Sequence, residues 1–145
     1  MNRFTNKIIL PVDRSILAKF TLTFLWMNFA IFSALAEVPA PEALPAGGRV
    51  IQGEGNFQYQ GNQLKIWQHS DRMINEWARF DVGEDATVNF IQPGRDSIAL
   101  NRVFSNDPSQ IFGKVTSTGQ LFLVNGSGVI FGESARIDTG SFRFC

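Results

Sequence analysis

Between residues 77 and 132, short apolar stretches recur every eight to ten residues, and each ends at Gly, Asn, Asp, Ser or Pro. Short alternating stretches bounded by turn-forming residues are typical of β-strands, and no stretch has the length or period of a helix. Further strand candidates lie upstream, at 50–52, 57–59 and 64–68. No predicted strand exceeds about six residues, which is a usual strand length. The chain is therefore expected to form an all-β domain.

The residues between these strands predict where the chain turns. Gly61-Asn62 fits the tight loop of a hairpin. Pro93 cannot donate a ladder hydrogen bond, so it is expected to end a strand at 88–92. Residues 73–79 are ambiguous, because their apolar side chains could share a helical face although the segment is too short to stand as a helix.

One strand is followed directly by a polar pair. Ile98 and Leu100 alternate before Asn101-Arg102, and Leu100 is expected to be buried. Asn tolerates positive φ and its amide can satisfy backbone donors, so Asn101 is expected at a corner where the chain turns.

Two architectures accommodate such a series of strands. One is a sandwich of two sheets, and the other is a stacked coil in which each strand pairs with the strand one turn further along. The even spacing and the abundance of Gly and Asn favour the coil, but no strict sequence repeat is present. The residues alone leave both architectures open.

Residues 1–36 have the organisation of a secretory leader. Four basic side chains and one acidic side chain precede or border an uncharged apolar run that ends in Ala-Leu-Ala at 34–36. A basic start, an apolar middle and small residues before a cut define a signal peptide, so cleavage is predicted between Ala36 and Glu37. The alternative is a retained membrane anchor. A spanning helix needs about 20 apolar residues, and this run is shorter, so no stable membrane span is expected after processing.

The remaining residues, 37–145, are expected to form one domain. They begin with a proline-containing segment at 37–48, which predicts an extended lead-in rather than a helix. Residues 37–145 hold nine basic and twelve acidic residues, so their formal charge is −3. They contain no basic stripe, which argues against a nucleic-acid-binding protein.

The chemistry-bearing residues are few and scattered. Cys145 is the single cysteine and His69 the single histidine, so neither an internal disulfide nor a cysteine- or histidine-rich metal site is expected. Asp81, Glu84 and Asp85 bracket a glycine and are interpreted as solvated turn residues. The sequence therefore predicts a protein that is not an enzyme and has no cofactor.

Six ordered segments carry a resemblance to a known family. They are LPAGGRV at 44–50, INEWARFDVG at 74–83, VNFIQP at 88–93, ALNRV at 99–103, PSQIFG at 108–113 and GQLFLVNGSGVIFG at 119–132. Over roughly residues 44–140 the chain resembles the N-terminal secretion domain of two-partner-secretion exoproteins, the filamentous-haemagglutinin family. The order and spacing of the six segments make this resemblance more specific than any single motif.

The resemblance implies a fold and an export route. The fold would be a right-handed parallel β-helix (β-solenoid) with an N-terminal cap, following the signal peptide at 1–36. The family implies the secretion domain of a large adhesin- or haemagglutinin-like virulence exoprotein from a Gram-negative bacterium. Such a chain crosses the periplasm, is recognised by an outer-membrane β-barrel transporter and folds coil by coil outside. It is then secreted or held at the cell surface, with a host-cell glycan or protein receptor as a further partner.

The resemblance also points to candidate recognition residues. They are the turn Asn125, Gly126, Ser127 and Gly128, together with the pairs Gln92-Pro93 and Asn101-Arg102; the alternative role for all of them is turn formation alone. The family usually has Asn-Pro-Asn-Gly at the turn. Proline fixes φ and so preorganises a turn. Gly126 and Ser127 therefore predict a less restrained turn, at a cost of about 0.4–1 kcal/mol through the entropy of the unfolded state.

Two alternative functions remain open at this stage. One is a stand-alone secreted glycan-binding module in which Trp67 and Trp77 stack on sugars, although tryptophans at strand positions are more often core residues. The other is a truncated remnant without function, because the chain stops at Phe142, Phe144 and Cys145 where family domains continue with further coils.

Overall fold

The structure is a computed structural model that describes residues 37–145, and residues 38–145 form one compact unit. This unit contains twelve strands: β1 (Arg49–Gln52), β2 (Gly55–Gln60), β3 (Gln63–Gln68), β4 (Arg72–Trp77), β5 (Thr87–Ile91), β6 (Ile98–Val103), β7 (Ser109–Ile111), β8 (Lys114–Ser117), β9 (Gln120–Asn125), β10 (Val129–Phe131), β11 (Arg136–Asp138) and β12 (Ser141–Phe144). In this part of the chain no helix is long and apolar enough to cross a membrane. The predicted signal peptide at 1–36 lies outside the described residues.

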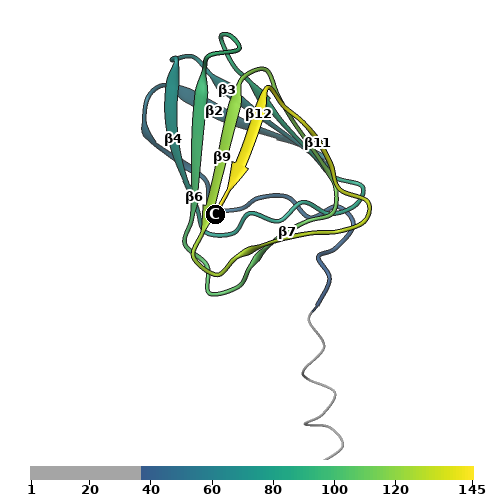
Figure 1. Cartoon of the computed structure of the whole chain (residues 1–145). Coiled ribbons are helices and arrows are strands. Elements are labelled where there is room, and N and C mark those ends of the chain that lie inside the picture. Colours follow the sequence, from purple (N-terminus) through teal and green to yellow (C-terminus); the bar gives the residue numbers. More distant parts are fainter. Residues whose placement is uncertain (1–36) are drawn as a thin grey trace, which may run out of the picture. The chain divides into compact units, whose positions relative to one another are not determined.

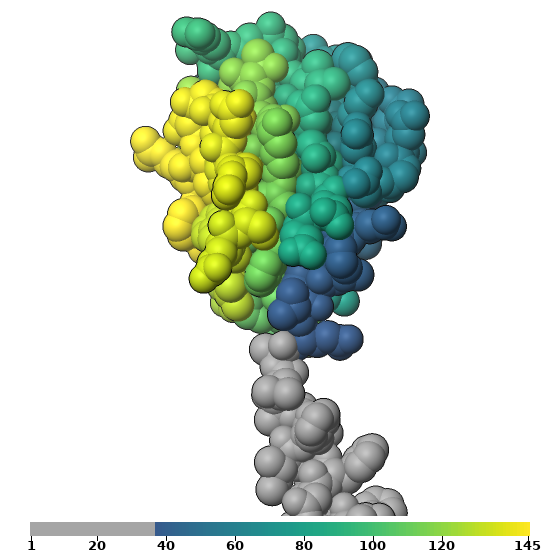
Figure 2. All heavy atoms as spheres, turned by 90° about the vertical axis from the view of Figure 1, so that its right-hand side faces the viewer, coloured from purple at the N-terminus to yellow at the C-terminus, as the bar shows by residue number. Residues whose placement is uncertain are grey.

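The strands form two five-stranded sheets, β1-β4-β6-β9-β12 and β11-β8-β5-β3-β2, and the pair β10-β7. From β3 onward every pairing between successive turns of the chain is parallel. In Figure 1, β4, β6, β9 and β12 lie side by side, and β11 lies on the opposite side of the enclosed core. Figure 2, a view of the right-hand side of Figure 1, shows successive parts of the chain as adjacent bands from blue to yellow. The chain is therefore a parallel β-helix, as the family resemblance predicts, and not a sandwich.

The register of the parallel strands aligns apolar side chains into columns inside the coil. One column contains Leu64, Val88, Val115 and Ile137, which are Cα partners along β3, β5, β8 and β11. Alternate residues of a strand point to opposite faces, so every second residue enters the core. The fully or almost fully buried core side chains are Leu64, Ile66, Met73, Trp77, Phe80, Val82, Ala86, Val88, Phe90, Ala99, Ile111, Val115, Leu121 and Leu123.

The N-terminal end of the coil is closed by strands of the opposite direction. β1 pairs with β4 and β2 pairs with β3, both antiparallel. The predicted hairpin at Gly61-Asn62 joins β2 and β3, and Gly61 has a φ of 56°. Tyr59 on β2 donates a 2.8 Å hydrogen bond to the Pro45 carbonyl, and burial raises the pKa of this phenol. These strands form the cap that the resemblance implies.

The lead-in at 37–48 is not helical, as predicted, but it turns at Pro41-Glu42, where Ala43 N donates to the Ala40 carbonyl at 2.9 Å, and it packs against the end of the first coil. Gly83 N donates to the Ala43 carbonyl and Asp85 N to the Pro41 carbonyl, both at 2.9 Å. Ala46 pairs with Arg79 in an isolated antiparallel bridge. These bonds satisfy backbone groups that the end of a solenoid would otherwise leave unpaired.

Three local expectations need correction. The ambiguous segment 73–79 is strand for most of its length, within β4. The strand before Pro93 ends at Ile91 rather than at Gln92; the Gln92 side chain continues the inward alternation and accepts a hydrogen bond from Gly119 N. Asp81 is 7% exposed and bonded to its neighbours, so it is not a solvated turn residue, whereas Glu84 and Asp85 are exposed.

In β6, the residues that face the core are not the ones that were predicted. Ala99 and Asn101 face the core with exposures of 0% and 2%, while Leu100 is only half-buried. Asn101 therefore lies inside a strand and not at a corner. This orientation turns the larger Leu100 outward. It is favourable because Ala99 is small and because Asn101 can make hydrogen bonds inside the coil.

Candidate functional site

The Asn125 side chain connects the turn at 125–128 to the segment one coil below it. Asn125 ends β9 and is 2% exposed. Its Nδ2 donates to the Asp107 carbonyl at 3.1 Å and to Ser109 Oγ at 3.0 Å, and its Oδ1 accepts from Ser127 N at 2.9 Å. One buried amide thus fixes both its own turn and the neighbouring coil.

The rest of the turn is closed by backbone hydrogen bonds. Gly128 N donates to the Asn125 carbonyl at 3.0 Å, and Gly128 has a φ of 102°, which favours glycine. Ser127 Oγ donates to the Ser105 carbonyl at 2.8 Å, and Ser109 N donates to the Gly128 carbonyl at 3.0 Å. The serine that replaces the family's second asparagine therefore still bonds the adjacent coil.

Gly126 occupies the second position of this β-turn, where proline is favoured. A Cβ there would meet nothing within 4 Å, and Gly126 is not among the glycines with positive φ. We expect Gly126→Pro to raise the free energy of unfolding by about 0.4–1 kcal/mol, because it restricts the unfolded chain. Urea denaturation of the variant and of Gly126→Ala would measure this difference. A midpoint for Gly126→Pro below that of the wild-type chain would contradict the turn assignment.

Gln92 and Asn101 lie in the interior of the coil. Gln92 Nε2 donates to Gln68 Oε1 at 3.1 Å, and Gln92 Oε1 accepts from Gly119 N at 2.7 Å. Asn101 Oδ1 accepts from Trp77 Nε1 at 3.0 Å and from Asn75 Nδ2 at 3.1 Å. Both side chains bridge successive coils and are almost inaccessible to a partner of the folded domain.

Pro93 and Arg102 reach the surface instead. Pro93 is exposed in the loop after β5, and the Arg102 side chain is 50% exposed on the outer face of β6. The structure thus separates the predicted recognition residues into two groups. Arg102 and Gly126 line one surface hollow and Pro93 is exposed outside it, whereas Gln92, Asn101 and Asn125 are buried.

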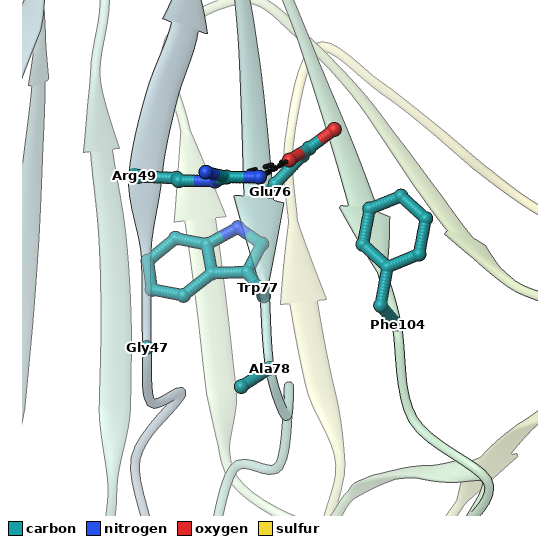
Figure 3. Close-up of a pocket in the computed structure, with 6 residues that line it drawn as sticks. All are labelled: Gly47, Arg49, Glu76, Trp77, Ala78 and Phe104. Atoms are coloured by element: carbon teal, nitrogen blue, oxygen red, sulfur yellow. Dashed lines mark hydrogen bonds and ion pairs between the residues drawn. The ribbon is translucent and has the colours of Figure 1, made fainter.

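Two open hollows flank an exposed aromatic side chain, Phe104, which the sequence prediction missed. The first has a volume of about 410 Å³ and is lined by Gly47, Arg49, Glu76, Trp77, Ala78 and Phe104 (Figure 3). The second has a volume of about 480 Å³, and Arg102, Phe104, Asn106, Val124 and Gly126 are among its lining residues. Phe104 is 61% exposed. Its position directly before the polar residues Ser105 and Asn106 is the sequence signal that could have identified it.

Charged side chains meet at the first hollow. Arg49 Nη2 lies 2.6 Å from Glu76 Oε2, and Arg102 Nη1 lies 4.0 Å from Glu76 Oε1. The Arg102 guanidinium carbon lies 5.4 Å from the centre of the Phe104 ring. Two arginines thus share one carboxylate, which leaves this surface with a formal charge of +1 from these three residues.

The two tryptophans do not form a common site. Trp77 is 1% exposed, and its ring packs 4.9 Å from Phe57 and 5.4 Å from Phe80, between ring centres. Trp67 is 37% exposed on β3. A sugar could reach Trp67 but could not stack on Trp77, so the predicted pair of stacking tryptophans is wrong.

The ionisable side chains Asp81 and His69 make hydrogen bonds to neighbouring residues. Asp81 Oδ2 accepts from Arg79, and Asp81 Oδ1 accepts from Gln110 N at 2.9 Å, which joins two coils. His69 Nε2 lies 3.0 Å from Asn56 Oδ1 at the surface. Within residues 37–145 no group of three or more His, Cys, Asp or Glu side chains is placed to hold a metal ion.

Three comparisons relate this geometry to known proteins. The family model described as the TPS secretion domain matches residues 42–143. A heme/hemopexin-binding protein of Haemophilus influenzae is 40% identical over 95 residues, covering 66% of this chain and 10% of that protein. A second Haemophilus influenzae protein of that name is 39% identical over 77 residues, covering 53% and 8% of the two chains. The chain spans about a tenth of the length of these relatives.

A solved structure has the same fold. The crystal structure of the HMW1 secretion domain from Haemophilus influenzae matches with a TM-score of 0.66 and 35% identity. The match covers 69% of this chain and 27% of that chain. The similarity therefore extends over most of the β-helix described above.

Proposed function

Because this chain belongs to the family of TPS secretion domains, we propose that it directs the export of a larger exoprotein and templates its folding as a β-helix. As a two-partner-secretion domain it has an outer-membrane transporter as partner and is secreted from a Gram-negative bacterium. The observation that carries this proposal is the family match over residues 42–143, which coincides with the capped coil. The mechanism is binding and templated folding, without a covalent step.

The arrangement of the strands supports templating in one direction. The cap places antiparallel strands β1 and β2 on the first coil, whereas every later coil is added through parallel pairing in an unbroken register. A finished coil exposes a row of backbone donors and acceptors to which the next coil can pair. Each added coil therefore extends the order of the one before it, and the cap prevents growth at the N-terminal end.

The finer features of the exported protein are proposals of their own. We propose that the signal peptide at 1–36, cut between Ala36 and Glu37, directs the chain to the periplasm, and that the exoprotein acts at the cell surface as an adhesin or haemagglutinin. A host-cell glycan or protein would then be its receptor. The family's export role supports these statements in outline, and the similar relatives are about ten times longer than the matched region.

The turn at 125–128 provides a test of the export role. Co-expressing the chain with the transporter of its two-partner system should release it into the medium, and Asn125→Ala should reduce the released amount severalfold. The substitution removes two hydrogen bonds to the adjacent coil and one within the turn, each worth about 1 kcal/mol. Quantitative immunoblotting of cells and medium measures the released fraction.

Ser109→Ala is the matched control, because it removes a hydrogen bond to the same Asn125 amide while leaving the turn residues unchanged. Asn125→Ala removes three hydrogen bonds and Ser109→Ala removes one to the same amide, so the two export defects are compared with the urea unfolding midpoints of the two variants. An export defect of Asn125→Ala that exceeds its loss of stability relative to Ser109→Ala would assign the turn a role in recognition. A defect in proportion to the loss of stability would assign it a structural role. Export of Asn125→Ala at the wild-type level would show that Asn125 is not needed for recognition.

A further inference from the structure

The turn at 125–128 contains a dipeptide that can modify itself. Asn125-Gly126 is the single Asn-Gly pair in the chain, and every other asparagine is followed by a residue that has a side chain. Because glycine has no Cβ, the Gly126 nitrogen is unhindered and can attack the preceding side-chain amide. We infer that Asn125 is a site of spontaneous deamidation in the unfolded chain, and that folding of the turn closes this site. With the export function taken as given, the pair is unprotected until the coils form outside the cell.

The reaction needs no reactant other than water. The Gly126 nitrogen attacks Cγ of Asn125, the Cγ–Nδ2 bond breaks, and Nδ2 leaves as ammonia with the proton from the Gly126 nitrogen. The product is a cyclic succinimide held by the new bond between Cγ and the Gly126 nitrogen. Water then opens either carbonyl of the ring, which yields aspartate or isoaspartate at position 125.

The folded turn protects Asn125 by holding its amide. Nδ2 donates to the Asp107 carbonyl and to Ser109 Oγ, and Oδ1 accepts from Ser127 N. Asn125 is buried, whereas Gly126 beside it is exposed. Loss of Nδ2 as ammonia would break both bonds to the neighbouring coil. The folded chain can therefore react only when the turn opens, and the rate falls as the free energy of that opening rises.

Neither product makes the same bonds as Asn125. An ionised aspartate has no N–H to donate to the Asp107 carbonyl, and it would place a buried carboxylate against that carbonyl oxygen. Isoaspartate also adds a methylene to the backbone. Residue 125 pairs with Val103 in the β6–β9 ladder, its N donates to the Cys145 carbonyl, and its carbonyl accepts from Gly128 N. A chain that is delayed before it folds therefore loses the means to close this turn.

Mass spectrometry of the full chain tests the site. The purified chain is incubated in a mildly alkaline buffer with and without guanidinium chloride, and peptide mapping follows the replacement of amide by carboxyl at each asparagine. In the denaturant Asn125 should react faster than every other asparagine, and at least ~tenfold faster than in the folded chain, because the latter must first open. Gly126→Pro is the matched control. Proline has no N–H and space is open at this position, so Asn125 should stay unmodified in the denatured variant.

A second measurement tests the consequence for folding. Wild-type chain aged in guanidinium chloride is returned to buffer and compared with fresh chain and with Asn125→Asp, which carries one of the two products. Both the aged chain and Asn125→Asp should unfold at a urea concentration about 1 M lower than the fresh chain, whereas ageing should not change Gly126→Pro.

Two results would overturn the inference. One is modification of Asn125 at the same rate in the folded and the unfolded chain. The other is an unchanged urea midpoint for aged chain in which Asn125 is modified. These measurements involve no transporter, so failure of the wild-type chain to appear in the medium with its transporter would refute the export function alone.

Discussion

Replacing Gly113 with alanine is expected to destabilise the domain by about 3 kcal/mol. Gly113 is buried at the corner between β7 and β8, where two successive coils touch through their backbones. A Cβ added to Gly113 would lie 2.0 Å from the Gly83 carbonyl oxygen and 2.4 Å from that of Ala86. Neither oxygen belongs to a flexible side chain, so the coils themselves would have to separate. Gly113 N also donates to the Val82 carbonyl at 3.1 Å, and separation would weaken this bond.

Gly94→Ala is the control for this substitution, because a Cβ at Gly94 would meet nothing within 4 Å. Urea denaturation followed by circular dichroism would compare the two variants. Gly94→Ala should stay within about 1 kcal/mol of the wild-type chain. If Gly113→Ala were equally stable, the close approach of the two coils would be wrong.

Replacing Asn101 with leucine is expected to destabilise the domain by about 2–4 kcal/mol, because it leaves two buried donors without a partner. Asn101 Oδ1 accepts from both Asn75 Nδ2 and Trp77 Nε1. Leucine itself fits the column, since Leu123 occupies the same register position in the next coil. The cost would therefore come from the lost hydrogen bonds rather than from packing. Equilibrium unfolding in urea measures it.

The double variant Asn75→Leu/Asn101→Leu provides the internal comparison. It removes the Asn75 donor together with its acceptor, and Asn75 Oδ1 has no hydrogen-bond partner to lose. The double variant should therefore be less destabilised than the sum of the two single variants. Strict additivity would show that the Asn75–Asn101 hydrogen bond contributes nothing to stability.

The strands of this fold could be predicted because their signals are local. The turn at Gly61-Asn62 and the alternation in β3, β5 and β9 identify short strands and their inward residues. The arrangement of these strands is set by contacts between residues about 20 to 27 positions apart, from Val129 with Ser109 to Thr87 with Lys114, and no strict repeat records that spacing. The choice of a coil over a sandwich therefore required the family resemblance.

The direction in which each side chain points, and the surface sites, were harder to predict because they too depend on residues far apart in the sequence. Hydrophobicity alone assigns Leu100 to the core, but hydrogen bonds from Asn75 and Trp77, which lie more than twenty residues away, turn Asn101 inward instead. Asp81 is bonded across coils in the same manner. The two hollows beside Phe104 combine residues from β1, β4, β6 and the turn at 125–128, and no short motif contains them together.

The N-terminal hairpin has a consequence for the order in which contacts can form. The pairing of β2 with β3 closes a loop of only Gly61 and Asn62, whereas every other strand pairing in residues 37–145 joins positions at least twenty residues apart. The entropy lost on closing a loop rises with its length, and distant pairings slow folding. The hairpin is thus the one sheet contact that needs no long-range search, and it belongs to the cap on which all later coils are built. A chain that emerges with its N-terminal end first would present its fastest-forming element before the slower ones.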